Sequence, residues 1–447
     1  MAGNRPVAHL AAPRNWINDP NGFIWFDGQY HLYSQHFPYA PLWGRMHWTH
    51  ATSKDLAVWE HHDIVLFPSK SYDSDGCFSG SAIVKDGQLL FFYTGVDYVE
   101  ADPENINKVL HDTYVACQVR IASPDGFTFD NLAGKQQVIP PIKNQALGSR
   151  YHTRDPKVWE YNGMLYMILG SKVQEPGKET TTPKVLIFRS KDSYEWEFLN
   201  ELASYGTLGY MWECPDLFCV DGQWMLTMSP MGMLDIPHVH ANQAIIAKVG
   251  FDNDTGEIDW DGKTYQFVDF GLDYYAGQST LDKDGRRIHV GWLRMTEALP
   301  RCDFMGVYCF PRLVEMKDGI IYTPVHPDIC AHFTDVCTEQ TLDRSKAFKI
   351  SATLSEGQQI KVGQYTVTAK AGSIVADRTG MVGEPKMQLI SATPALDEAL
   401  EVEVYVDHCV VEVYVNGGRY AIAHIVNPEA LAGELSIPEG ASIAQFA

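Results

Sequence analysis

The chain has 447 residues, 45% of them hydrophobic and 20% charged, which is the composition of a folded protein long enough for two domains. Asp and Glu number 56 against 35 Lys and Arg, so the formal charge is −21. A field of that sign argues against nucleic acid and anionic membrane surfaces as partners, but it does not exclude a neutral small molecule.

The N-terminal segment, MAGNRPVAHLAAPRNWINDP, lacks the continuous apolar stretch of a secretory signal. No run of about 18 apolar residues occurs elsewhere, so we expect no membrane-spanning helix. The 9 cysteines are scattered and include no Cys-x-x-Cys pair. Reduced thiols in a cytoplasmic protein are the simplest interpretation.

The first 325 residues repeat one pattern, in which an apolar or aromatic run, an Asp-Gly or Asn-Gly turn and a second aromatic-rich run follow one another. Its copies lie at 23–35, 81–95, 157–171, 216–229 and 279–293. Asp-Gly and Asn-Gly favour the positive φ angles of tight hairpin turns. The turn glycines recur at intervals of 59 to 76 residues, which leaves room for two more strands per copy. The pattern predicts a five-bladed β-propeller over residues 1–325; unrelated hairpins in a sandwich are the alternative.

Two prolines, Pro324 and Pro327, mark a change in pattern. Beyond them tryptophan is scarce, and polar and apolar residues alternate with a period of two, as in KAFKISATL and EVEVYVDHCVVEVYV. This alternation predicts a β-sandwich over residues 332–447 and hence an all-β fold for the whole chain. No candidate for chemistry stands out in this second domain.

A polar residue precedes each predicted turn by six to eight positions. These residues are Asp19, Ser79, Asp155, Glu213 and Gln278. Since equivalent strands of a propeller begin at its central channel, we expect these side chains to converge there. Each carboxylate alone also fits a structural role, such as a turn at Asn-Asp-Pro-Asn-Gly or an ion pair between Arg154 and Asp155. Three carboxylates at similar places in the repeats favour catalysis.

Cleavage of a glycosidic bond needs one protonated and one ionised carboxyl group. Glu213 stands between Trp212 and Cys214 in an apolar run, so we expect desolvation to raise its pKa and make it the acid. Asp19 is flanked by asparagines whose amides favour its charged form. The pair therefore predicts a glycoside hydrolase.

The segments WINDPNG, WGRMHW, CFSGS, RDPKVW and WECPDLF closely resemble the family-32 glycoside hydrolases, which include invertases, sucrose-6-phosphate hydrolases, levanases and inulinases. The resemblance spans roughly residues 10–325, and the C-terminal alternation resembles that family's β-sandwich. It implies a retaining β-fructofuranosidase that acts on sucrose, sucrose 6-phosphate or short fructo-oligosaccharides through a covalent fructosyl-enzyme. It implies no metal and no organic cofactor.

The resemblance also implies roles for single residues. Asp19 would be the nucleophile, Glu213 the general acid and then the base, and Asp155 a group that stabilises the transition state. The residues expected to line the fructose subsite are Asn18, Gln35, Trp43, Phe78, Ser79, Arg154, Tyr275 and Trp292.

Some segments depart from the family pattern or fit other functions. YSQHFP at 33–38 differs from the family's usual Tyr-Gln-Tyr-Asn-Pro-like run, and the acidic loop 97–112 is expected on the leaving-group side. The histidines of 237–240 have metal-like spacing but no third ligand in view. Two alternatives remain: a fructosyltransferase on the same fold, and a non-catalytic propeller that binds fructan.

Overall fold

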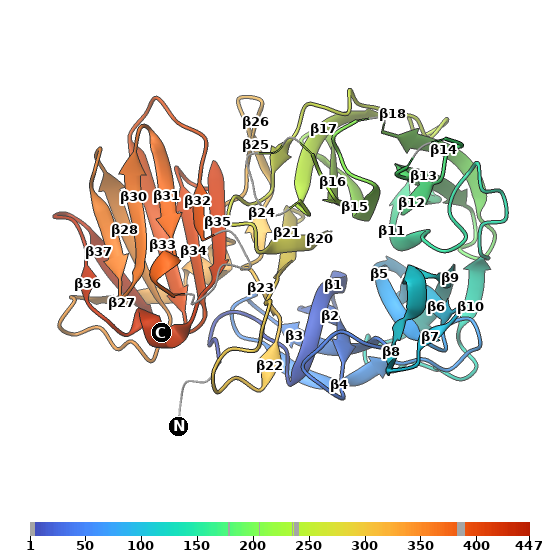
Figure 1. Cartoon of the computed structure of the whole chain (residues 1–447), viewed down its shortest axis with the longest axis horizontal. Coiled ribbons are helices and arrows are strands. Elements are labelled where there is room, and N and C mark those ends of the chain that lie inside the picture. Colours follow the sequence, from blue (N-terminus) through green and yellow to red (C-terminus); the bar gives the residue numbers. More distant parts are fainter. Residues whose placement is uncertain (1–4, 178, 205, 235, 237–240, 382–388) are drawn as a thin grey trace.

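The computed structural model describes residues 5–177, 179–204, 206–234, 236, 241–381 and 389–447. Almost all of its regular structure is β. A ring of sheets forms one part of the molecule, and two packed sheets form the other (Figure 1). The predicted all-β fold, a propeller followed by a sandwich, is confirmed.

The ring consists of antiparallel sheets whose innermost strands face a common centre (Figure 1). Within the described ranges there are five such sheets. Their innermost strands are β1 (Asn15–Phe26), β5 (Gly76–Lys85), β11 (Arg154–Tyr161), β15 (Met211–Val220) and β20 (Tyr274–Leu281). The ring is closed, because β1 contacts β5 and β20, β5 contacts β11, and β15 contacts both β11 and β20.

The five predicted hairpins pair each innermost strand with the next strand of its sheet. These second strands are β2 (Gln29–Phe37), β6 (Gln88–Tyr98), β12 (Met164–Val173), β16 (Gln223–Met231) and β21 (Arg287–Leu293). In the first four hairpins both turn residues have positive φ, for example +51° at Asp86 and +77° at Gly87. The fifth turn is wider, since Leu281 pairs with Arg287 and Gly285 alone takes positive φ there.

The remaining strands lie farther from the centre. They are β3 (His47–Ser53), β4 (Glu60–Leu66), β9 (Tyr114–Ser123), β10 (Gln136–Ile139), β13 (Thr182–Ser190), β14 (Glu197–Ala203), β17 (Ile245–Phe251), β18 (Ile258–Asp259), β19 (Gln266–Phe267), β22 (Phe304–Met305), β23 (Val307–Tyr308) and β24 (Arg312–Leu313). β22 follows the fifth hairpin in the sequence but pairs in parallel with β1 of the first sheet. This pairing joins the last sheet to the first. Two small hairpins lie outside these five sheets. They pair β7 (Ala101–Asp102) with β8 (Asn105–Val109) and β25 (Glu315–Lys317) with β26 (Ile320–Tyr322).

Each innermost strand carries a β-bulge near its start. The pairing register shifts between Ile17 and Pro20, Cys77 and Gly80, Arg154 and Lys157, Glu213 and Asp216, and Tyr275 and Gln278. A bulge redirects side chains and commonly occurs beside active sites. The predicted polar residues therefore lie near the bulges but do not occupy equivalent register positions. Asp19 and Ser79 lie within their bulges, Glu213 lies just before its bulge and Gln278 lies just after its bulge.

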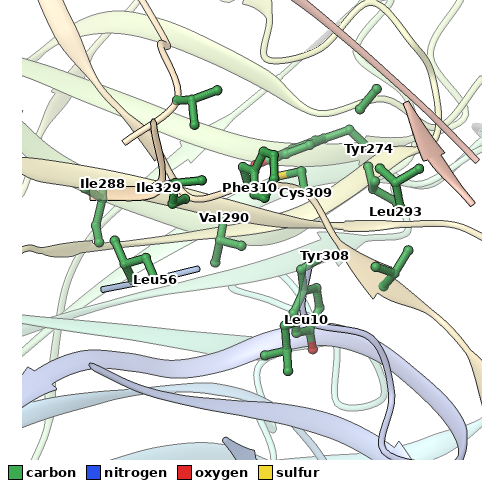
Figure 2. Packing of buried hydrophobic residues seen from close by; sticks show 14 of the residues in the cluster. Leu10, Leu56, Tyr274, Ile288, Val290, Leu293, Tyr308, Cys309, Phe310 and Ile329 are labelled. Atoms are coloured by element: carbon green, nitrogen blue, oxygen red, sulfur yellow. The ribbon is translucent and has the colours of Figure 1, made fainter. Parts of the chain in front are cut away.

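The hydrophobic core crosses from the first sheet to the last. Figure 2 shows Leu10 and Leu56 from the N-terminal side of the chain packed near Ile288, Val290 and Tyr308 of the fifth sheet. The same buried cluster includes Tyr405, Val410 and Tyr414 of the sandwich. The fixed position of β1 in the ring thus depends on contacts with the end of the propeller and with the second domain.

The sandwich packs a larger sheet on a smaller one. The larger sheet contains β27 (Phe333–Cys337), β37 (Ser442–Phe446), β28 (Phe348–Leu354), β33 (Leu400–Asp407), β34 (Val410–Val415) and β35 (Tyr420–Ile425). The smaller contains β32 (Ile390–Ala392), β31 (Ser373–Asp377), β30 (Tyr365–Lys370), β29 (Gln359–Val362) and β36 (Leu435–Ser436). Single-turn helices, α1 (Pro327–Cys330) and α2 (Pro428–Leu431), flank this domain. The boundaries at 325 and 332 stay predictions.

None of the helices in the described part of the chain is long and apolar enough to cross a bilayer. The two α-helices are four residues each.

Candidate active site

A cavity of about 260 Å³ lies where the bulged strand starts meet. Its lining comes from all five sheets of the ring and from the loops between them. Every site residue predicted from the sequence except Ser79 lines it; the set is Asn18, Asp19, Gln35, Trp43, Phe78, Arg154, Asp155, Glu213, Tyr275 and Trp292. Folding thus brings together side chains that are up to 274 positions apart, from Asn18 to Trp292.

Asp19, on β1, accepts hydrogen bonds from neutral groups alone among the described residues. Ser79 donates to its Oδ2, the amide of Asn18 donates to Oδ1 at 3.1 Å, and the thiol of Cys214 lies 3.6 Å from Oδ2. Burial, and the negative charge of Glu213, raise the pKa of Asp19 to about 6 in spite of these donors. The amide of Asn18 favours the charged form of Asp19, as expected, but desolvation outweighs this hydrogen bond.

Glu213, at the start of β15, is held by two side chains from other sheets. Arg154 Nη2 donates to Oε1 at 2.7 Å, and the Tyr275 hydroxyl donates to Oε2 at 2.8 Å. Its side chain remains 22% exposed, and both carboxyl oxygens contact polar groups rather than the apolar neighbours expected from the sequence. Successive side chains of a strand point to opposite faces, and Trp212 is fully buried in a hydrophobic cluster behind the site.

Asp155, on β11, sits at the bulge with a φ of +64°. Its Oδ2 accepts a hydrogen bond from the backbone N–H of Cys214 at 3.0 Å and lies 3.8 Å from Nε of Arg154. Burial, together with the charges of Glu213 and Asp19, raises its pKa to about 7, although Arg154 opposes the rise. Three carboxyl groups therefore share one pocket, and two of them titrate near neutrality.

Neutral polar groups connect the floor of the pocket. Asn18 donates to Gln35 Oε1 at 2.8 Å, and Gln35 donates in turn to Ser79 Oγ at 2.5 Å. Ser79 does not line the cavity itself, but it forms hydrogen bonds with two residues that do, Asp19 and Gln35. Gln278 lies still deeper, where it bridges Phe23 N and Gly80 O of the first two sheets, so it supports the channel rather than the pocket.

Aromatic rings form the walls. Trp43 meets Phe78 edge to face with ring centroids 5.8 Å apart, and Trp292 meets Trp16 at 5.7 Å. The guanidinium of Arg294 lies 4.8 Å from the ring centroid of Tyr275, which holds that ring beside Glu213. Flat apolar faces around a few fixed polar groups suit a sugar ring.

Other lining residues were not identified from the sequence. They are Val109, Asp112, Tyr114, Lys172, Tyr210 and Met231. Val109 and Asp112 belong to the acidic loop that was expected on the leaving-group side, so that loop does reach the pocket. Lys172 and Met231 stand at the ends of β12 and β16. In an antiparallel hairpin the end of the second strand lies beside the start of the first. Hairpin geometry alone would therefore have placed Lys172 and Met231 at the cavity.

Within the described ranges no group of three or more His, Cys, Asp or Glu side chains is arranged to hold a metal ion. The histidines of segment 237–240 lie outside those ranges.

Comparison with known proteins identifies the family of the chain. Residues 9–324 match the model for the glycosyl hydrolases family 32 N-terminal domain, and residues 334–444 match that for the family 32 C terminal. The chain is 30% identical to a raffinose invertase of Escherichia coli over 97% of its own length and 91% of that enzyme's. It is 37% identical to a sucrose-6-phosphate hydrolase of E. coli over 72% of its own length and 64% of that enzyme's.

Among solved structures, a β-fructofuranosidase of Bombyx mori superposes with a TM-score of 0.79 at 26% identity, covering 99% of this chain and 90% of that one. A sucrose-6-phosphate hydrolase of Lactobacillus gasseri shares the fold with a TM-score of 0.84 at 20% identity, covering 99% and 93%. The two family models together cover nearly the whole chain, in the same order as the two structural parts described above. The chain belongs to glycosyl hydrolase family 32.

Proposed function

We propose that the protein hydrolyses the terminal β-fructofuranosidic bond of sucrose, sucrose 6-phosphate or short fructo-oligosaccharides, with retention of configuration. The observation that carries the proposal is the single cavity that contains Asp19, Asp155 and Glu213 from three different sheets. The names of the relatives, raffinose invertase and sucrose-6-phosphate hydrolase, support a β-fructoside of short chain length.

In the first step Asp19 attacks the anomeric carbon of fructose while Glu213 protonates the departing glycosidic oxygen. With a pKa of about 6, Asp19 is mostly ionised at neutral pH and is more basic than an exposed aspartate. Arg154 and Tyr275 fix the Glu213 carboxyl group through both of its oxygens, so the proton is delivered from a defined position.

In the second step Glu213 removes a proton from water, and the water attacks the anomeric carbon and frees Asp19. Asp155 contacts the fructose hydroxyls and favours the positive charge that develops on the ring in both transition states. Asn18, Gln35 and Trp43 hold the fructose, and Phe78 and Trp292 exclude water from its faces.

The test assigns each carboxyl group separately. Asp19→Ala and Glu213→Ala should each lower the rate on sucrose by several orders of magnitude. Azide supplied to Asp19→Ala should form a fructosyl azide of inverted configuration, and azide supplied to Glu213→Ala should form one of retained configuration. With 4-nitrophenyl β-fructofuranoside, whose leaving group needs no proton, Glu213→Ala should recover much of its first step. Sucrose cleavage at normal rates in both variants would refute the proposal.

We also propose that the protein works in the cytoplasm. The buried Cys77, Cys309 and Cys409 are free thiols in the structure, as expected in a reducing compartment. Immunodetection in fractionated source cells, with a periplasmic and a cytoplasmic marker, tests this location.

A further inference from the structure

A second cavity, of about 490 Å³, lies between the sandwich and residues 294–303, the loop that joins β21 to β22. The loop contributes Pro300 and Arg301, and the rest of the described lining comes from the sandwich. Among the described residues, none that lines this second cavity also lines the catalytic cavity. No step proposed above uses it, so its side chains require a separate explanation.

Basic side chains outnumber acidic ones in the lining of the second cavity. The basic residues are Arg301, Arg344, Lys346 and His408. Glu429 is the one acidic residue in the described part of the lining. The chain as a whole has a formal charge of −21, so this local excess of basic groups is opposite to the overall composition. Such a cavity in an acidic protein favours an anionic ligand.

The guanidinium group of Arg344 is held in place without a neutralising acid. It is half-buried, and its Nη1 donates to Leu431 O at 3.1 Å and to Gly433 O at 2.5 Å. Its Nη2 has no hydrogen-bond partner among the described residues. Burial lowers the pKa of Arg344, and no acidic neighbour opposes this effect. An anion that binds beside this group would therefore compensate a charge that the protein leaves uncompensated.

The other two cations have acidic partners, but these ion pairs are loose. Arg301 lies 3.8 Å from Glu429, and Lys346 lies 3.7 Å from Asp335. All four side chains are mostly exposed or nearly so, and solvent screens ion pairs of this kind. Both cations can therefore turn to a bound anion at little cost.

Apolar side chains complete the lining of the second cavity. They include Phe348, Val362, Val406 and Leu431, which belong to the buried cluster of the sandwich. Small-molecule sites commonly have volumes of roughly 300–1,000 Å³ and combine apolar walls with a few polar groups. Cations together with apolar walls suit an anion that carries an organic body better than they suit a bare inorganic ion.

A phosphate ester fits this set of groups better than a carboxylate does. It carries a charge of about −1.5 to −2 at pH 7 and offers three strong acceptor oxygens, so it can contact several cations at once. The planar donors of a guanidinium group match the geometry of phosphate oxygens. Two arginines and a lysine line this cavity, whereas one of them would suffice for a single carboxylate.

We propose that the second cavity is a binding site for a small organic phosphate ester, with Arg344 as its main anchor. The ligand would contact the propeller loop and the sandwich together, and it would stabilise the folded protein because it binds the folded state alone. The site is separate from the catalytic cavity, so this inference does not depend on the proposed function.

The experiment measures binding to the full-length protein by titration calorimetry at pH 7. The probes are phenyl phosphate, inorganic phosphate and benzoate. Phenyl phosphate should bind at one site with a Kd of about 1 mM or lower. Inorganic phosphate, which lacks the apolar body, and benzoate, which has one negative charge, should each bind at least about 10-fold more weakly.

Arg344→Met should weaken the binding of phenyl phosphate by at least about 10-fold. Because Arg344 also bonds two backbone carbonyl groups, Lys346→Glu is a second variant at an exposed position, and it should weaken binding by roughly fivefold or more. Arg419→Met is the matched control, since Arg419 is a half-buried arginine of the sandwich outside the cavity. It should bind like the unaltered protein. Phenyl phosphate should also raise the Tm of the control but not that of Arg344→Met.

The outcomes test this site without reference to catalysis. Absence of phenyl phosphate binding, or equal affinity in Arg344→Met, Lys346→Glu and Arg419→Met, overturns the site. Equal affinity for benzoate overturns the choice of a phosphate ester. Asp19→Ala should lose activity on sucrose and still bind phenyl phosphate normally, so failure of either proposal leaves the other standing.

Discussion

The catalytic pocket and the interface between propeller and sandwich both bury several carboxyl groups, yet the two regions treat them in opposite ways. In the pocket, burial raises the pKa of Asp19 to about 6 and that of Asp155 to about 7. At the interface, the pKa of Glu412 falls to about 2 even though that residue is fully buried. Burial is common to both regions, so the difference lies in what each carboxyl group contacts.

At the interface cations contact the carboxylates directly. Arg312 Nη2 lies 2.8 Å from Glu412 and 2.7 Å from Asp269, and the imidazole of His9 lies 3.0 Å from Glu412 and 2.8 Å from Asp407. Desolvation at His9 is outweighed by these two acids, and its pKa rises to about 9. Asp269 is an exception, because burial there exceeds the effect of Arg312 and raises its pKa to about 6.

In the pocket Arg154 binds Glu213 and reaches Asp155 only at 3.8 Å, while Asp19 receives hydrogen bonds from the neutral side chains of Ser79, Asn18 and Cys214. At the interface the charged side chains pair with one another, and these ion pairs hold the two domains together. The pocket leaves negative charge partly uncompensated, which is unfavourable for stability but useful for stabilising positive charge on a reacting sugar. If this contrast is correct, substitutions in the two regions should have opposite effects on stability.

The largest effect is expected at Arg312. Arg312→Met leaves Asp269 buried without its cation and leaves Glu412 with His9 alone, and breaking a buried pair typically costs about 3–5 kcal/mol. Unfolding in urea at pH 7 measures the loss. Arg189→Met is the control, since Arg189 pairs with the mostly exposed Glu197 and should cost about 1 kcal/mol or less. Equal losses in the two variants would contradict the contrast.

His9 should give the interface a pH dependence. Its folded pKa of about 9 exceeds the ordinary value of 6.5, so the stability it contributes is complete below pH 6.5 and is lost as the pH rises through 9. The difference corresponds to roughly 3 kcal/mol. His9→Gln should flatten the unfolding free energy between pH 6.5 and 9.5, as measured by urea titrations across that range. A slope that persists in the variant would assign the pH dependence to other groups.

Sequence patterns identified the three carboxyl groups of the pocket but none of the ion pairs at the interface. The five hairpins and the motifs around Asp19, Asp155 and Glu213 lie within short segments, so local turn chemistry and resemblance identified them. His9, Asp407 and their hydrogen bonds join segments almost 400 positions apart. No local sequence pattern identifies such a contact, so the sequence indicated no functional side chains in the sandwich.

The environments of single carboxyl groups were also beyond sequence reasoning. Trp212 is buried in the cluster behind the site and the thiol of Cys214 lies against Asp19. The partners of Glu213, Arg154 and Tyr275, come instead from β11 and β20. The bulges also limit prediction from the sequence. Counting residues back from each turn misplaces a side chain by one or two positions when a bulge intervenes. Solvation depends on these three-dimensional neighbours, and for that reason burial raises the pKa of Asp19 in spite of the hydrogen bond from Asn18.

Asp155→Asn should stabilise the protein at pH 8. The folded pKa of about 7 lies above the ordinary 3.8, so the unaltered protein loses stability as the pH rises from about 4 to above 7, and asparagine removes this loss. We expect a gain of roughly 1–3 kcal/mol at pH 8 that disappears near pH 4, together with severe loss of activity. Asp407→Asn, at the interface, should instead destabilise the protein at pH 8, because cationic His9 lowers the pKa of Asp407. Thermal unfolding at the two pH values distinguishes the signs.

The smallest effect is expected at Ser79, which contacts Asp19 without lining the cavity. Its hydroxyl donates to Asp19 and lowers the pKa of that carboxyl group, so Ser79→Ala should raise the pKa above about 6. Since the nucleophile must be ionised in the free enzyme, the acidic limb of kcat/KM against pH should move to higher pH by up to about one unit, equivalent to about 1.4 kcal/mol. Ser81→Ala, on the same strand but bonded to Pro156 O, should leave the limb in place. If both variants titrate alike, the acidic limb belongs to a group other than Asp19, and the hydrogen bond from Ser79 has no part in setting the charge of the nucleophile.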